Sequence, residues 1–164
     1  MREVIEMAKV LIVYYSRSGN TKAMAEAVAE GVREEGLECT VRRVEDTTPD
    51  DMKEHEGIIL GTPTYFGDAA AEVRKLIDES VKYYGKFEGK VGAAFASCGA
   101  HGGGAETAIM SILQAFLIHG MIIQGISVEG AHYGPISVGK PKEADLKECR
   151  NLGRRVARLV KKLF

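Results

Sequence analysis

Three hydroxyl side chains and a glycine are crowded into the short segment SRSGNT. Ser16, Ser18 and Thr21 can donate hydrogen bonds to an anion, and Gly19 permits a tight backbone turn. A helix is predicted to begin near Thr21, so the free N–H groups of its first turn would point to the same place. The combination favours a cradle for a phosphate. The alternative is that Ser18 or Asn20 only caps the helix.

Two common phosphate motifs are missing from this segment. A P-loop needs a second glycine and a lysine at fixed positions to surround several phosphates and a metal ion. The dinucleotide-binding pattern G-x-G-x-x-G is missing too. The segment is therefore suited to one phosphomonoester group.

A second loop, TPTYFGD, places two aromatic residues between a proline and a glycine. Tyr65 and Phe66 could stack on a planar ligand, although aromatic residues in a loop are more often part of a core or simply exposed. Their position at the end of a predicted strand favours the ligand.

A third loop, SCGAHGGG, has four glycines in eight residues, so its backbone could approach a planar ligand closely and present N–H groups to it. The alternative is a flexible surface loop. Cys98 follows a strand, as the nucleophile of low-molecular-weight tyrosine phosphatases does. That class needs an arginine six residues later, where this chain has Gly104, and is excluded. Cys98 is predicted to be a small neighbour of the ligand or a buried thiol.

Alternating apolar strands and amphipathic helices must position these loops. The pattern predicts strands at 9–15, 38–45, 57–63, 90–97 and 121–128, and helices at 21–36, 68–85 with Asp68 as cap, 104–120 and 142–164, with a brief connection at 46–56. Such alternation predicts an α/β fold, a doubly wound five-stranded parallel sheet with helices on both faces. Ligands bind such sheets at the carboxyl ends of the strands, where all three loops would lie.

Composition limits the function classes. The 164 residues are 45% hydrophobic and 27% charged, which fits a single domain over 1–164, and the net charge of −1 argues against nucleic acid or anionic membranes as partners. The longest apolar run is too short and too polar to span a bilayer. The N-terminal segment lacks the apolar stretch of a signal peptide. Three cysteines without a C-x-x-C pair argue against a metal site and for a reducing, cytoplasmic location.

The residues of the three loops resemble a known family. SRSGNT after VLIVYY is similar to the phosphate loop of the flavodoxins, and GTPTYFG resembles the flavin-flanking loop of the WrbA-type NAD(P)H:quinone oxidoreductases. The pieces GGGAET, HGM and YGP fall where that subfamily carries similar ones. The resemblance covers essentially the whole chain and implies a flavodoxin-like three-layer sandwich that binds FMN.

The resemblance also implies roles for individual residues. The FMN phosphate would be held by Ser16, Arg17, Ser18, Gly19, Asn20 and Thr21. The isoalloxazine ring would be lined by Thr64, Tyr65, Phe66 and Gly67, and its pyrimidine edge by Ser97, Cys98, Gly99, Ala100, His101 and Gly102.

Three further residues are candidates near the reacting centre. His101 could donate a hydrogen bond or a proton to reduced flavin, and is the candidate catalytic residue. His119 and Tyr133 are candidates on the substrate side, since a histidine like His119 approaches flavin across a subunit contact in the WrbA-type family. A histidine that closes a helix is also favourable without any function. The Gly67–Asp68 pair resembles a turn in which the glycine peptide reorients toward reduced flavin.

The chain departs from the WrbA-type pattern in three ways. The segment between the second and third predicted strands is shorter, tryptophan is missing, and the Cys98–His101 loop is one residue longer. These differences bear on the subfamily's tetramer and quinone pocket rather than on the flavin. The apolar helix AIMSILQAFLI is either buried on both sides or half of a subunit interface, so a homo-oligomer stays open.

Two functions follow from a bound FMN. One is an oxidoreductase that passes electrons from NAD(P)H to a quinone or similar acceptor. The other is a one-electron carrier between protein partners. Carrier flavodoxins are typically strongly acidic, and that surface steers them to basic partners, so the net charge of −1 favours the oxidoreductase. A flavin-binding sensor is a third class without a dedicated sequence feature here.

Overall fold

The computed structural model describes residues 7–164. Its central sheet has the order β2-β1-β3-β5, with β6 and β7 both along the outer edge of β5, and all these pairings are parallel. The strands are β1 (Lys9–Tyr14), β2 (Glu38–Arg43), β3 (Gly57–Tyr65), β4 (Asp68–Ala69), β5 (Val91–Cys98), β6 (Ile122–Ile123) and β7 (Ile136–Val138). The α-helices are α1 (Asn20–Glu34), α2 (Pro49–Lys53), α3 (Ala71–Glu79), α4 (Ala105–Ile118) and α5 (Glu143–Leu163), with 3₁₀ turns η1 (Val44–Asp46) and η2 (Ser80–Tyr83).

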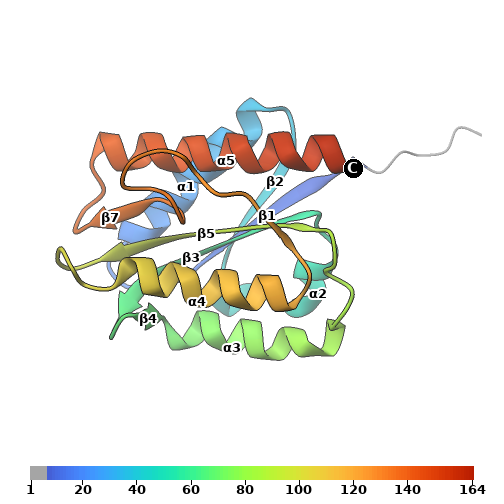
Figure 1. Cartoon of the computed structure of the whole chain (residues 1–164), viewed down its shortest axis with the longest axis horizontal. Coiled ribbons are helices and arrows are strands. Elements are labelled where there is room, and N and C mark those ends of the chain that lie inside the picture. Colours follow the sequence, from blue (N-terminus) through green and yellow to red (C-terminus); the bar gives the residue numbers. More distant parts are fainter. Residues whose placement is uncertain (1–6) are drawn as a thin grey trace, which may run out of the picture.

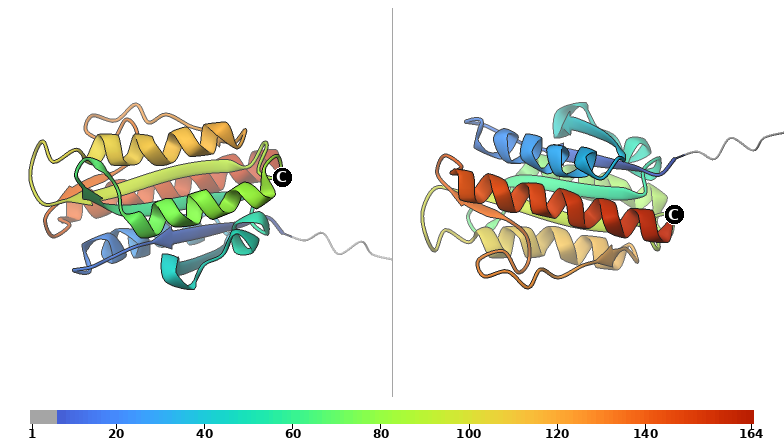
Figure 2. Two further views of the ribbon diagram at one scale, coloured as in Figure 1. Left: turned by 90° about the horizontal axis from the view of Figure 1, so that it is seen from below. Right: turned by 90° about the horizontal axis from the view of Figure 1, so that it is seen from above.

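Helices cover both faces of the sheet, which confirms the predicted doubly wound α/β class. α1 and α5 lie side by side on one face, and α3 and α4 on the other (Figures 1 and 2). Each layer has its own apolar core cluster, because successive residues of the central strands point to opposite faces. Leu11 and Val13 pack toward α3 and α4, and Ile12 packs toward α1 and α5.

Two glycines let α1 and α5 approach until their backbones touch. A Cβ atom built on Gly31 would lie 2.0 Å from the carbonyl oxygen of Arg150, and one built on Gly153 would lie 2.0 Å from that of Val28. Any larger residue at either position would force the helices apart. The contact is reciprocal, since each helix supplies one glycine.

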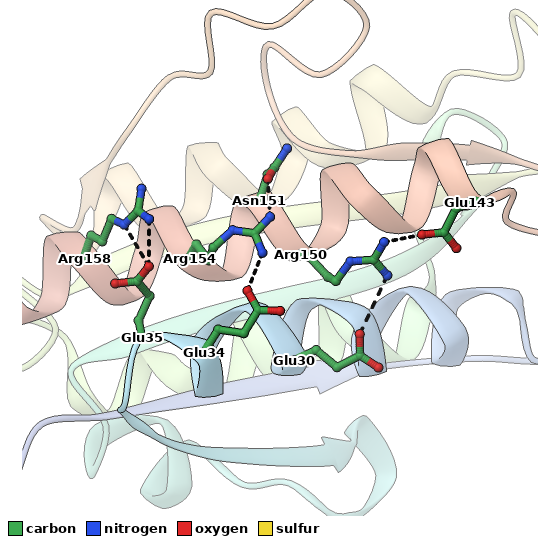
Figure 3. A network of polar contacts seen from close by, with 8 residues as sticks. All are labelled: Glu30, Glu34, Glu35, Glu143, Arg150, Asn151, Arg154 and Arg158. Atoms are coloured by element: carbon green, nitrogen blue, oxygen red, sulfur yellow. Dashed lines mark hydrogen bonds and ion pairs between the residues drawn. The ribbon is translucent and has the colours of Figure 1, made fainter.

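Ion pairs line the exposed edge of the same helix pair (Figure 3). Arg150 pairs with Glu30 at 3.7 Å and also with Glu143, Arg154 pairs with Glu34, and the Arg158 Nε donates to Glu35 at 2.9 Å. Hydrogen bonds from Arg158 and Lys161 lower the pKa of the Glu35 carboxyl. Exposed pairs of this kind each contribute little to stability.

The fifth strand is not the continuous segment 121–128 that the sequence predicts. β6 pairs with the beginning of β5 at Val91–Gly92, β7 pairs with its end at Ala96–Cys98, and the chain between them leaves the edge of the sheet. The backbone returns through Gly134, whose added Cβ would lie 2.0 Å from the carbonyl oxygen of Ala94. The edge strand is therefore built from two short pieces.

Two local predictions also need correction. Asp68 does not cap the second long helix, because it belongs to the two-residue strand β4 and α3 begins only at Ala71. The N–H of Ala70 instead donates to the Thr62 hydroxyl at 2.9 Å. The predicted connection at 46–56 contains a helix of its own, α2, with Pro49 at its first position.

Candidate functional site

The loop after β1 leads directly into an uncapped helix. Gly19 has φ 97° and is the N-cap of α1, and no side chain hydrogen-bonds the first N–H groups of that helix. Ser16 Oγ accepts a hydrogen bond from the N–H of Gly19 at 3.0 Å, which fixes the turn. The interpretation that Ser18 or Asn20 caps the helix is therefore wrong. The free N–H groups and the positive end of the helix dipole remain available to an anion.

A cavity of about 310 Å³ lies at the start of α1. Of the described residues that line it, none is acidic and one, Arg17, is basic. The lining comes from the loops after β1, β3 and β5 and from one residue beyond β7: Arg17, Ser18, Asn20, Thr21, Pro63, Thr64, Tyr65, Ser97, Cys98, Gly99 and Gly139. Nine of the predicted cofactor residues thus line one cavity.

Buried hydroxyl groups connect the loops that line this cavity. Thr21 is 1% exposed, and its Oγ1 lies 2.9 Å from Ser97 Oγ, which links α1 to the end of β5. The Thr64 hydroxyl donates to the Ser97 carbonyl at 2.9 Å, which links the end of β3 to the same place. These bonds connect the start of α1 to the ends of β3 and β5.

The aromatic loop is a two-residue hairpin turn between β3 and β4. Tyr65 pairs with Asp68, and the turn residues Phe66 and Gly67 have φ of 51° and 75°. Positive φ is unusual for phenylalanine, and Phe66 is also fully exposed. A strained, exposed aromatic side chain beside a cavity is consistent with ligand contact.

The aromatic loop is fastened to the glycine-rich loop. A Cβ on Gly104 would lie 2.7 Å from the Cα of Gly67, so the two backbones are in contact. The Thr107 hydroxyl lies within hydrogen-bond distance of the carbonyl oxygens of both Gly67, at 2.6 Å, and Gly104, at 2.8 Å. Thr107 is a residue that the sequence reasoning missed, because nothing in its surroundings distinguishes it from an ordinary first-turn helix residue.

The glycine-rich loop divides the predicted residues between two cavities that meet at Cys98. The second cavity, of about 510 Å³, is lined by Ala100, His101 and Gly102 on the loop, and by Glu106, Lys142 and Asp145 from the first turns of α4 and α5 and the residue before α5. Burial raises the pKa of the Cys98 thiol, whose Sγ donates to the Ala100 carbonyl at 3.3 Å. A protonated thiol here is a neighbour of the site rather than a nucleophile.

The two substrate-side candidates lie apart from these cavities. His119 follows the last residue of α4, at the opposite end of that helix, where Nε2 lies 2.8 Å from Ser80 Oγ. Tyr133 is 53% exposed in the segment between β6 and β7. Neither side chain is among those lining the two cavities.

Pro63 and Gly139 line the first cavity without having been predicted. Pro63 ends the predicted third strand and was assigned only that role. Gly139 follows β7, the strand piece that the sequence did not reveal, and its N–H donates to the Cys98 carbonyl at 2.8 Å. The only sequence signal for this position was a glycine, Gly139, directly after the short apolar stretch that ends at Val138.

The described residues contain neither a group of possible metal ligands nor a helix that could span a membrane. Over residues 7–164, no three His, Cys, Asp or Glu side chains gather closely enough to hold a metal ion. Within the same range, no helix has both the length and the apolar character required to cross a membrane.

The donor set and shape of the first cavity fit FMN. An acid-free cradle at a helix start suits the terminal phosphate, and the contacts between the Tyr65 loop and the glycine-rich loop would form the walls beside a planar ring. The cradle follows from the geometry of this chain and does not depend on any resemblance.

Comparisons with known proteins identify the family of this chain. The family model described as Flavodoxin matches residues 12–119. A flavodoxin of Aquifex aeolicus is 39% identical, over 94% of this chain and 88% of its own length, and an NAD(P)H dehydrogenase (quinone) of Archaeoglobus fulgidus is 35% identical, over 96% and 100%.

Solved structures are similar as well. A flavodoxin from the domain Archaea superposes with a TM-score of 0.79 at 34% identity, covering 93% of this chain and 99% of its own. A WrbA-like flavodoxin from Agrobacterium tumefaciens gives 0.80 at 26% identity, covering 96% and 99%. The predicted fold and the predicted FMN cofactor are thereby confirmed, and the chain belongs to the flavodoxin family.

Proposed function

We propose that this protein is an FMN-dependent oxidoreductase that passes electrons from NAD(P)H to a quinone or similar small acceptor. The observation that carries the proposal is the pair of cavities meeting at Cys98, one suited to FMN and the other, of about 510 Å³, large enough for a small molecule. Relatives named NAD(P)H dehydrogenase (quinone) support it.

The residues of the first cavity would hold the cofactor. Ser18, Asn20 and Thr21, with the first N–H groups of α1 and the Arg17 guanidinium, would bind the phosphate. Ser16 and Gly19 would shape the turn behind it. Their contribution is binding and orientation.

The remaining predicted residues would surround the ring. Thr64, Tyr65, Phe66 and Gly67 would form one wall, and the loop Ser97, Cys98, Gly99, Ala100, His101 and Gly102 would offer its N–H groups at the edge. When bound, FMN can accept a hydride from a nicotinamide and pass its electrons onward. The glycine-loop N–H groups would stabilise negative charge there, because their dipoles are already oriented.

His101 would be the residue that holds a proton beside the reacting centre. It is exposed at the rim of the second cavity, with Glu106 and Lys142 in the same lining. An imidazole in this place can donate a hydrogen bond to an anionic ring or acceptor.

A cytoplasmic location agrees with three free thiols, at Cys39, Cys98 and Cys149.

A second candidate function is electron carriage between protein partners. The fully exposed Phe66 beside the first cavity supports it, because an apolar side chain there would meet a docking protein before a small molecule. Relatives named flavodoxin support it too. The net charge of −1 argues against strong electrostatic steering.

Anaerobic stopped-flow mixing separates the two functions. The FMN-loaded protein is mixed with NADH or NADPH alone, and then with a quinone added. The oxidoreductase is expected to bleach the flavin absorbance rapidly and to recover it when the quinone arrives. Bleaching that requires a partner reductase would contradict the proposal and favour the carrier. The variant His101→Ala, loaded with FMN to the same extent, tests the proton role through the pH dependence of the bleaching rate.

A further inference from the structure

An arginine of the neighbouring strand reaches the loop 16–19, which joins β1 to α1. Arg43 is the last residue of β2 and pairs in parallel register with Tyr14, the last residue of β1. Its guanidinium lies over the Tyr14 ring, 5.8 Å from the centroid, and its Nη2 donates to the backbone carbonyl of Ser16 at 3.4 Å. Among the described residues, Arg43 is the only side chain outside this loop that hydrogen-bonds the loop backbone.

Glu45 fixes the guanidinium in this place. The same Nη2 of Arg43 donates to Glu45 Oε1 at 2.9 Å. The carboxylate also offsets the charge of the arginine, so the two side chains together add no net charge behind the loop. We therefore expect Arg43 to act on the loop through the direction of its hydrogen bond rather than through its charge.

The hydrogen bond to Ser16 orients a peptide group. None of the described peptide bonds is cis, and in a trans peptide the C=O and the N–H point in opposite directions. Because the Ser16 carbonyl is held toward Arg43, the N–H of Arg17 points away from Arg43. No described residue accepts a hydrogen bond from this N–H, and Arg17 lines the first cavity. The N–H is thus available to an anion.

Ser16 is held through its side chain as well. Its Oγ accepts the N–H of Gly19 at 3.0 Å, and the residue is only 8% exposed. We propose that Arg43 is a positioning residue of the phosphate cradle, which holds the Ser16 carbonyl and thereby keeps the Arg17 N–H directed at the FMN phosphate. The inference rests on the phosphate-binding residues proposed above, and not on the choice between oxidoreductase and electron carrier.

The test compares FMN with riboflavin, which has the same ring and ribityl chain but no phosphate. Arg43→Met removes the donor and is expected to raise the dissociation constant for FMN about 3- to 10-fold, the effect of one net hydrogen bond, and to leave that for riboflavin unchanged. Fluorescence titration of the empty protein measures both constants. Arg43→Lys keeps a donor and the charge, and is expected to recover part of the lost FMN affinity. Equal losses for the two ligands, or FMN binding as tight as in the wild type, would overturn the inference.

Two further variants separate direction from charge. Arg43→Met with Glu45→Gln removes one cation and one anion, so the net charge is kept and the FMN defect is expected to persist. Wild-type affinity in this double variant would assign the defect to the unpaired Glu45 carboxylate and refute the positioning role. Arg42→Met is the matched control, because Arg42 points to the other face of the sheet and pairs with Asp51 at 2.6 Å. Its loss should leave the affinities for both ligands unchanged, and an FMN defect of the same size would reduce the effect of Arg43 to charge alone.

Thr21→Ala in the same titrations distinguishes a failure of this inference from a failure of the cradle. If Thr21→Ala weakens FMN binding and Arg43→Met does not, the cradle stands and only the role of Arg43 is wrong. If neither variant changes the FMN affinity, the phosphate is held elsewhere and both proposals fail. Circular dichroism and urea unfolding verify that each variant is folded.

Discussion

Replacing Thr21 by alanine should separate the structural role of this residue from its role toward phosphate. The Thr21 hydroxyl is buried and lies 2.9 Å from Ser97 Oγ, and it also lines the first cavity. Without the Thr21 hydroxyl, the hydroxyl of Ser97 loses one hydrogen-bond partner while it stays buried, since Ser97 is only 6% exposed. The variant therefore affects both the empty protein and the cofactor complex.

The two effects have different sizes. Loss of the buried hydroxyl pair should reduce the free energy of unfolding by about 1–3 kcal/mol, the cost of an unsatisfied buried group. A hydrogen bond to a charged phosphate contributes about 1.5–3 kcal/mol, so the dissociation constant for FMN should rise about 10- to 150-fold. The second effect is present only if Thr21 binds the phosphate.

Fluorescence titration of the empty protein with FMN measures the second effect, and urea unfolding measures the first. Ser97→Ala is the matched control, because it removes the same pair but keeps the Thr21 hydroxyl and the backbone N–H of residue 97, which is the group that this loop would offer to the ring. Its FMN affinity should stay near that of the wild type. A Thr21→Ala protein that is less stable but binds FMN with unchanged affinity would refute the cradle at α1. The double variant Thr21→Ala with Ser97→Ala completes a double-mutant cycle, which gives the interaction energy between the two hydroxyl groups.

Three further predictions concern other parts of the chain. Gly153→Ala should lower the free energy of unfolding by about 1–3 kcal/mol, because its Cβ would collide with the backbone of α1, and a lower midpoint in urea would verify this. Thr107→Val should weaken FMN binding about 2- to 10-fold, because it removes the hydrogen bond to the Gly67 carbonyl, whereas Thr107→Ser keeps the hydroxyl and should bind normally. Equal FMN titration curves for the two variants would contradict a role for this hydrogen bond in FMN binding. Cys149 is 0% exposed and burial raises its pKa to about 12, so a thiol reagent at pH 8 should leave it unlabelled until the protein unfolds, whereas the partly exposed Cys39 and Cys98, whose pKa values are also raised, should react slowly.

The sequence was sufficient to predict the central strands of the sheet and the strand ends at which the candidate site lies. β1 and β3 are long, nearly continuous apolar runs, and such runs are buried on both faces only in a parallel sheet covered by helices. Once their order is known, the loops at their carboxyl ends must meet. Thr21, Thr64 and Ser97 come together for that reason.

The edge of the sheet could not be predicted in the same way. The segment 121–128 is apolar enough to form one strand, and whether it pairs along its whole length depends on contacts with residues far away in the sequence. The turn of the chain at Gly134 against β5 decides this, and Gly139 joins the cavity only as a consequence. Asp68 was misassigned because the Thr62 hydroxyl, eight residues before Ala70, accepts the N–H of Ala70 at the start of α3.

The backbone contact between α1 and α5 has a consequence for how the protein is made. α1 carries the candidate phosphate cradle at one end, but the side of α1 that holds Gly31 packs against a helix that is translated more than 100 residues later, as the Glu34–Arg154 pair at a separation of 120 residues shows. While the ribosome is still adding the middle of the chain, the glycine face of α1 is bare and contacts of such long sequence separation cannot form. Cofactor capture should therefore follow synthesis of α5, and a nascent chain halted before residue 143 should not retain FMN, although all three loops of the site have already been synthesised.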